Sequence, residues 1–154
     1  MPSDDRPRID VTVDVVALTE VEHEVRVLVV RRGNPPFEGE WALPGGYLEV
    51  DEHLAAAASR ELHEETGIAV HSDELHQLGA YGDPDRDPRN RTVSVAFLLE
   101  LDREIEVEGG SDAADARWRS VEELLKRNEL AFDHETIVRD ALELSRWDPT
   151  LDDH

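Results

Sequence analysis

Three glutamates, Glu61, Glu64 and Glu65, have the types and the spacing that could do chemistry in this chain of 154 residues. In a helix, with about 100° per residue, they would lie within an arc of roughly 100° on one face. Like charges at this spacing repel each other, at a cost of about a few tenths of a kcal/mol per pair. Mg²⁺ would offset this repulsion, because it is typically held by a few carboxylates together with substrate phosphates. Taken alone, the three residues would also suit a solvated, charged helix face.

The residues around these glutamates predict a helix over 52–66. This segment is rich in Leu, Ala, Arg and Glu and contains neither Gly nor Pro. Asp51 could cap its start, and Gly67 could end it. Leu54 and two of the alanines that follow it lie on or near the arc of the glutamates, two turns earlier. The acids therefore prolong the apolar face, whereas a solvated acidic face would lie opposite it.

Two further charged residues could support the glutamates. Arg60 lies next to Glu61 and four residues before Glu64, so it could orient these carboxylates or partly neutralise them. Glu52 lies half a turn away on an ideal helical wheel. We therefore expect Glu52 to cap or brace the helix and not to contact a metal directly.

A fixed spacing of glycines, acids and aliphatic residues includes this helix and extends beyond it. Its positions are Gly46, Glu52, Arg60, Glu61, Leu62, Glu64, Glu65, Gly67 and Ile68. They match the pattern G-x5-E-x7-R-E-U-x-E-E-x-G-U, in which U is a bulky aliphatic residue, at every specified position. The sequence therefore resembles the Nudix hydrolase family, and the strands and helices expected around the pattern extend this resemblance over most of the chain.

The resemblance implies hydrolysis of a nucleoside diphosphate linked to another group, with Mg²⁺ or Mn²⁺ as the cofactor. It implies that Glu61, Glu64 and Glu65 are metal ligands, with the carbonyl of Gly45 as a frequent additional ligand. It also gives Glu61 and Glu64 a catalytic role and makes Arg60 the residue that orients the carboxylates. Metals would clamp the pyrophosphate and lower the pKa of a bound water, which attacks one phosphorus.

The general base stays open at this point. In the family it is either a glutamate of the motif or an acid on a later loop, and the candidates near that loop are Glu104, Glu106, Glu108, Asp112 and Asp115. The first three alternate with Ile105 and Val107, as the polar face of a short strand would. All five would also suit a solvated surface.

The region after the motif bears on the substrate. Pro84, at 16 residues after Ile68, resembles the ADP-ribose pyrophosphatase subgroup. The loop over 82–91 is similar to the same region of those enzymes. Its arginines, Arg86, Arg89 and Arg91, could bind phosphate or ribose, or could pair with neighbouring aspartates.

Aromatic residues and one histidine are further candidates. Phe37 or Trp41 could stack on adenine, although core packing is favoured for Trp41. The segment 131–134 resembles one that ADP-ribose pyrophosphatases share with Nudix-related transcriptional regulators. Its His134 could reach a substrate phosphate, but a hydrogen bond at a helix start is favoured.

We therefore expect Mg²⁺-dependent hydrolysis of ADP-ribose to AMP and ribose 5-phosphate. One alternative is a pyrophosphohydrolase of nucleoside triphosphates, such as oxidised nucleotides. The other is a non-catalytic Nudix domain that senses ADP-ribose. Such regulators carry a C-terminal DNA-binding part, and the 86 residues after Ile68 leave little room for one. The intact carboxylates of the motif also favour an enzyme.

Strands and helices, which must position these residues, follow one another in an irregular order along the chain. We expect strands over 9–19, 24–32, 41–43, 47–50, 74–81, 92–101 and 116–120, and helices over 52–66, 121–126 and 135–145, the last capped by Asp133. This order predicts an α+β fold. The resemblance implies a Nudix-type α/β/α sandwich with a mixed β-sheet and a loop–helix–loop at the motif. We expect one domain over 1–154, and the subgroup is often a homodimer.

Charge excludes several other classes. The 37 Asp and Glu against 16 Lys and Arg give a net charge of −21, so a nonspecific nucleic-acid binder is disfavoured. The chain has no cysteine and no apolar stretch near the roughly 18 residues of a membrane span. We therefore expect a cytoplasmic protein with a small-molecule partner and without nucleic acid or membrane partners. Lys126 is the only lysine, and acid excess with so little lysine favours a halophilic source over ordinary solubility charge.

Overall fold

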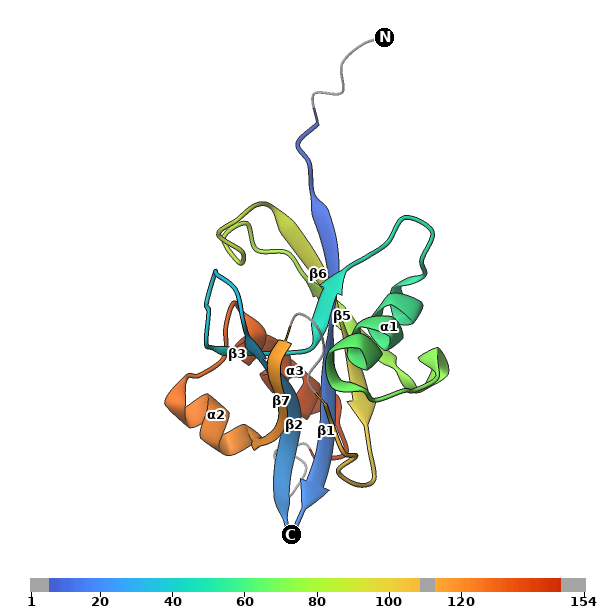
Figure 1. The fold of residues 1–154 in the computed structure, drawn as a ribbon, viewed down its shortest axis with the longest axis vertical. Coiled ribbons are helices and arrows are strands. Elements are labelled where there is room, and N and C mark those ends of the chain that lie inside the picture. Colours follow the sequence, from blue (N-terminus) through green and yellow to red (C-terminus); the bar gives the residue numbers. More distant parts are fainter. Residues whose placement is uncertain (1–5, 109–112, 148–154) are drawn as a thin grey trace.

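The computed structural model describes residues 6–108 and 113–147, and it shows one sheet between helices (Figure 1). In the sheet, β3, β2, β1, β6 and β5 are neighbours in that order, while β4 pairs with β1 and β7 pairs with β2. The strands are β1 (Asp10–Val21), β2 (Glu24–Arg32), β3 (Trp41–Ala42), β4 (Gly45–Tyr47), β5 (His76–Tyr81), β6 (Thr92–Glu100) and β7 (Ala113–Ser120). The helices are α1 (Leu54–Thr66), α2 (Val121–Arg127) and α3 (His134–Leu144), with a 3-10 turn, η1, at Ser72–Glu74.

The sheet is mixed, as predicted. β1 and β6 run parallel, with residues 10–18 of β1 paired along the whole of β6, and every other pair of strands is antiparallel. β4 pairs with β1 so that Gly46 lies opposite Val13 and Gly45 lies opposite Asp14. The motif therefore enters α1 directly from the middle of the sheet.

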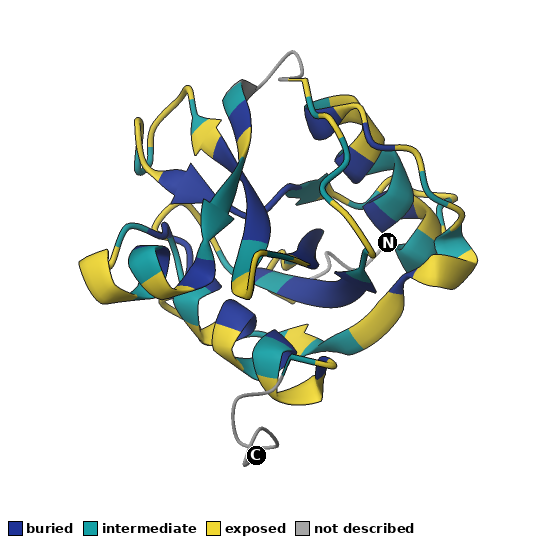
Figure 2. Ribbon diagram, turned by 90° about the horizontal axis from the view of Figure 1, so that it is seen from below, coloured by how far each residue is buried: buried dark blue, intermediate teal, exposed yellow. Residues whose placement is uncertain are grey.

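Alternating side chains of the central strands divide the core into two layers. Val15 and Ala17 of β1 pack with α1, whereas Val16 and Leu18 of the same strand pack with α2 and α3. Figure 1 shows α1 on one side of the sheet and α2 with α3 on the other, and Figure 2 shows that the helices are buried toward the sheet and exposed outward. This is the α/β/α sandwich that the sequence predicted.

Several boundaries differ from the prediction. The strand expected over 47–50 lies at Gly45–Tyr47, and the strand expected over 116–120 begins earlier, with β7 starting at Ala113. Residues 104–107 do not form a strand, because Ile105 and Val107 pack against the core without pairing to the sheet. Asp51 does not cap α1: the residue before the helix is His53, which makes no side-chain capping bond. No helix in the described ranges is long and apolar enough to cross a membrane.

Candidate active site

Helix α1 forms one wall of the site. Small and apolar residues on its inner face hold it against the sheet. Ala57, Ala58 and Leu62 are fully buried beneath the helix. Thr66 donates its hydroxyl to the carbonyl of Leu62 at 2.7 Å, and Gly67 ends the helix in the left-handed region at φ 80°. Because these residues face the sheet, Glu61 and Glu65, near one edge of the same face, come to lie over β4.

Arg60 ties the start of the helix to the loop before it. Its guanidinium donates to both carboxylate oxygens of Glu52, at 2.6 and 2.9 Å, and to the carbonyl of Tyr47 at 3.1 Å. This bidentate bond lowers the pKa of Glu52 and raises the pKa of Arg60, so the pair stays charged. Glu52 therefore braces Arg60.

The same guanidinium also reaches the predicted metal ligands. It lies 3.3 Å from a carboxylate oxygen of Glu64 and 3.6 Å from one of Glu61. The Glu61 side chain is 12% exposed and that of Glu64 is 53% exposed, so solvent screens Glu61 less. Arg60 thus partly neutralises two like charges that helical spacing places side by side.

Two glycines of β4 let the sheet approach these carboxylates closely. A Cβ on Gly46 would overlap the carboxylate of Glu61, and a Cβ on Gly45 would overlap the carbonyl oxygen of Val13. The backbone N–H of Gly45 donates to Glu65 at 2.7 Å. The glycines are therefore required by the packing of β4 between β1 and α1.

Glu61, Glu64 and Glu65 line one cleft of about 320 Å³ together with Gly45. Within the described ranges, no three acidic or imidazole groups are already gathered around a point that could hold a metal ion. The donor set is nevertheless all oxygen and mostly anionic, which is the chemistry that Mg²⁺ and Mn²⁺ require. The residues present therefore fit a hard divalent cation.

The facing wall of the cleft carries arginines from the loop over 82–91. Arg86 is buried and donates to both carboxylate oxygens of Asp133 at 2.9 and 2.7 Å. Arg89 donates to both oxygens of Asp87, at 3.0 and 2.7 Å. Both arginines line the cleft, and each has an acidic partner, although the partner of Arg86 lies 47 residues away in sequence.

Asp14 and His134 form a buried polar floor between the two walls. Asp14 accepts a hydrogen bond from Ser94 and lies 3.6 Å from Nε2 of His134. Nδ1 of His134 accepts from the backbone N–H of Leu43 at 3.0 Å, which requires a neutral imidazole. Burial lowers the pKa of His134 in agreement with this bond. His134 thus makes the helix-start contact favoured from its sequence.

Other predicted substrate residues do not line the cleft. Pro84 is exposed, and Arg91 has one buried nitrogen with no hydrogen-bond partner among the described residues. Phe37 packs edge-on against Phe132, with ring centroids 4.8 Å apart. Trp41 is 4% exposed and belongs to the core. Of the predicted substrate residues, Arg86, Arg89 and His134 therefore line the cleft, whereas Pro84, Arg91, Phe37 and Trp41 do not.

The acids of the later loop lie away from the cleft where the structure describes them. Glu104 pairs with Arg26, and Asp115 pairs with Arg117 at 2.8 Å. Neither of them lines the cleft, nor do Glu106 and Glu108. Asp112 falls outside the described residues.

The cleft residues that had no assigned role in the sequence prediction include Asp14, Arg32 and Phe132. Asp14 is an acid in an apolar strand, which was a visible signal for a buried functional group. Phe132 lies in the segment that had already been singled out for His134. Arg32 is the last residue of the strand expected over 24–32.

The sequence matches the NUDIX domain family over residues 8–141. The chain therefore belongs to the Nudix family, and the resemblance derived from the spacing of its motif is confirmed.

Within the family, the chain is similar to two curated relatives and one solved structure in particular. The chain is 40% identical over 127 residues to an ADP-ribose pyrophosphatase of Methanocaldococcus jannaschii, covering 82% of this chain and 70% of that enzyme. It is 34% identical to the ADPR responsive transcriptional repressor NtrR of Acinetobacter baylyi, covering 89% of this chain but only 54% of the repressor. The NUDIX domain of Shewanella oneidensis NrtR, crystallised with ADP ribose, superposes with a TM-score of 0.82 at 30% identity, covering 92% of this chain and 93% of that domain.

Proposed function

We propose that this protein hydrolyses the pyrophosphate bond of ADP-ribose to AMP and ribose 5-phosphate with Mg²⁺ or Mn²⁺. The observation that carries the proposal is the cleft itself, in which three carboxylates of α1 face arginines of the loop over 82–91. A cation on the first wall and guanidinium groups on the second suit a small dianion, even in a chain of net charge −21. The 40% identity to an ADP-ribose pyrophosphatase favours this substrate.

In this mechanism Glu61, Glu64, Glu65 and the carbonyl of Gly45 would hold the divalent cation. When bound, the cation supplies charge to the pyrophosphate oxygens and makes water more acidic. Arg60 orients Glu61 and Glu64. The described acids of the later loop do not line the cleft, which favours Glu61 or Glu64 as the base that removes a proton from the attacking water.

The proposal is tested with purified protein and a panel of nucleotides in the presence and absence of Mg²⁺. ADP-ribose should be converted to AMP and ribose 5-phosphate, and Glu65→Gln should lower kcat by about 10²-fold or more, because a metal ligand is worth several kcal/mol. Glu20→Gln, at an exposed position on β1, is the matched control and should leave turnover unchanged. Cleavage of nucleoside triphosphates alone would overturn the choice of ADP-ribose. Unchanged turnover in Glu65→Gln would overturn the metal assignment.

A second candidate is a domain that binds ADP-ribose without cleaving it. It is favoured by the 34% identity to the Acinetobacter repressor over most of this chain. Calorimetry with ADP-ribose separates the two functions: a sensor would bind ADP-ribose with Mg²⁺ present and release no AMP over hours. The intact motif carboxylates, all three in the cleft, favour the enzyme.

We further propose that the protein is a cytoplasmic homodimer adapted to high salt. The acid excess supports the adaptation, since salt screens the self-repulsion of a chain with net charge −21. The free energy of unfolding should therefore rise between 0.1 and about 2 M KCl. Light scattering over the same range of KCl concentrations measures the molar mass in solution, which tests for the dimer.

A further inference from the structure

Arg32, the last residue of β2, differs from Arg86 and Arg89, the arginines of the facing loop that line the same cleft. It is half-buried and lines the cleft, and its Nε donates to the carbonyl of Pro36 at 2.7 Å. Its guanidinium carbon lies 4.9 Å from the centroid of the Phe132 ring. Arg86 and Arg89 each have a bidentate aspartate, whereas the described residues provide no ion pair for Arg32.

This lack of an acidic partner has an electrostatic consequence. Burial, together with the nearby charge of Arg89, lowers the pKa of Arg32. A half-buried cation without an acidic partner is unfavourable in the empty cleft, and a bound anion would remove that cost. The charges of Asp87 and Glu65 act in the opposite direction but do not cancel the effect of burial, and a bound anion would add to them.

Phe132 is held beside Arg32 by contacts on both sides of it in the sequence. Ala131 donates its N–H to the carbonyl of Trp41 at 2.8 Å, and Asp133 accepts from Arg86. Phe132 itself has a φ of 54°, in the left-handed region that a bulky residue rarely adopts. Backbone in this region persists when the surrounding structure imposes it, and it is concentrated at functional sites.

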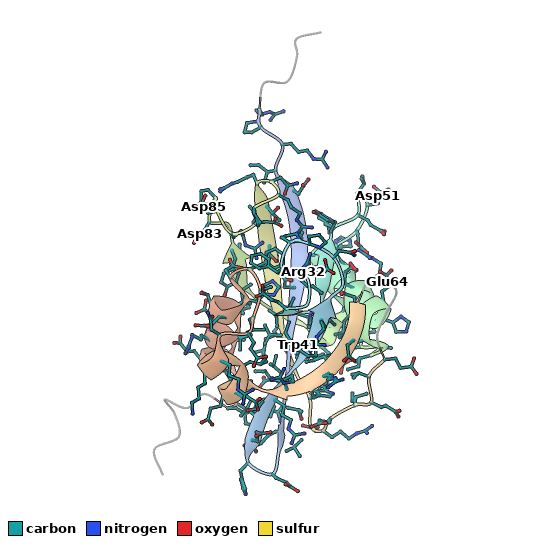
Figure 3. All side chains as sticks on the ribbon, turned by 60° about the vertical axis from the view of Figure 1, so that its left-hand side comes forward. Arg32, Trp41, Asp51, Glu64, Asp83 and Asp85 are labelled. Carbon is teal, nitrogen blue, oxygen red and sulfur yellow. The ribbon has the colours of Figure 1, made fainter. Side chains whose placement is uncertain are left out.

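We propose that Arg32 binds a phosphate oxygen of the substrate from the side of the cleft opposite α1, and that Phe132 is a positioning residue that holds the Arg32 guanidinium for this contact. The ligand chemistry is the diphosphate of a nucleoside diphosphate derivative, so the inference rests on the proposed function and deepens it. In Figure 3, Arg32 lies between Glu64 on one side and Asp83 and Asp85 of the loop over 82–91 on the other. A diphosphate in the cleft would then meet positive charge from two directions, from the cation held by the carboxylates of α1 and from the guanidinium of Arg32.

The test is a double-mutant cycle on kcat and KM. Arg32→Gln should lower kcat/KM for ADP-ribose by about 10- to 100-fold, because a hydrogen bond to a charged group is worth roughly 1.5–3 kcal/mol. Arg32→Lys should restore part of this loss, since lysine keeps the charge but lacks the planar fork. Phe132→Leu should lower kcat/KM by about 2- to 5-fold, the value of one cation–π contact. In the Arg32→Gln background, Phe132→Leu should have no further effect.

Three outcomes would overturn the inference. Unchanged kcat/KM in Arg32→Gln would remove Arg32 from the site. No recovery of kcat/KM in Arg32→Lys would show that the positive charge of this residue does not contribute to substrate binding. A full effect of Phe132→Leu in the Arg32→Gln background would mean that Phe132 contacts the substrate itself. Arg127→Gln, which removes an exposed arginine of α2, controls for net charge, and thermal unfolding of each variant controls for folding.

Failure of the proposed function gives a different result. Wild-type protein would then leave ADP-ribose intact but cleave another nucleotide of the panel. The same cycle on that nucleotide tests Arg32 equally well, because the argument depends on the phosphate and not on the adenosine or ribose.

Discussion

The wall of the cleft that contains α1 comes from one continuous stretch, residues 45–67, whereas the facing wall joins the end of β2, the loop over 82–91 and the segment before α3. In the first wall the decisive spacings are three and four residues, as between Arg60 and Glu64. In the second they are long: Arg86 bonds Asp133 across 47 residues, and Leu43 bonds His134 across 91. Under the proposed function, the first wall would hold the cation, and the second would bind the rest of the substrate.

This difference predicts that substitutions in the two walls have different effects, on activity in one wall and on stability in the other. Substitutions in the α1 wall should reduce activity in a folded protein, because its contacts orient carboxylates near the surface. Substitutions in the Arg86–Asp133 pair of the facing wall should reduce stability, because this pair is largely buried and holds distant segments together. The exception is Arg32, whose removal should affect activity alone.

The largest expected effect is a loss of stability when an ion pair of the facing wall is broken. Asp133→Asn leaves the buried guanidinium of Arg86 without its bidentate partner, so the free energy of unfolding should fall by about 3 kcal/mol. Urea unfolding measures this loss. Asp85→Asn, an exposed neighbour of Arg86, should change it little. Equal stability of the two variants would break the comparison between the walls.

The next effect concerns the α1 wall. A Cβ at Gly46 would overlap the carboxylate of Glu61, so Gly46→Ala must displace that side chain. We expect kcat/KM to fall by about 10²-fold, the cost of misplacing a catalytic group by about 1 Å. Gly79→Ala is the control, because a Cβ there meets nothing within 4 Å. Wild-type kinetics in Gly46→Ala would show that the close approach of β4 to α1 is not needed.

The brace between Glu52 and Arg60 comes third. Glu52→Gln removes the charge that holds the guanidinium in place, and the half-saturating Mg²⁺ concentration should rise about 10-fold, as is typical for partners of metal ligands. Titration of activity against Mg²⁺ measures this change. An unchanged titration would mean that Arg60 needs no brace to orient Glu61 and Glu64.

The smallest effect is the pH dependence of the buried floor. The folded-state pKa of His134 lies below its unfolded value of about 6.5, so the unfolded chain binds the extra proton and stability falls as pH drops through that value. The free energy of unfolding should therefore be smaller at pH 6 than at pH 7. Unfolding at both pH values should show a smaller difference in His134→Gln than in wild type. The exposed His76→Gln should behave as wild type.

Prediction from sequence succeeded where the interaction is local. The 3.6-residue period of a helix placed Glu61, Glu64 and Glu65 on one face, and the structure has all three in one cleft. The order of strands and helices predicted an α+β fold, and the structure has a mixed sheet with helices on both faces. Asp51 was wrong as a helix cap because α1 begins only at Leu54, after a loop that Glu52 and Arg60 hold together.

The sequence by itself therefore determined the family and the carboxylate wall, since both depend on one continuous segment, residues 46–68, and the family resemblance carried by that segment implied the sandwich. Only the tertiary structure decided that Arg86 pairs with Asp133, that Phe37 packs on Phe132, and that Arg32 has no acidic partner among the described residues. Each of these depends on which strands become neighbours, and no local pattern of charges or aromatic residues specifies that choice.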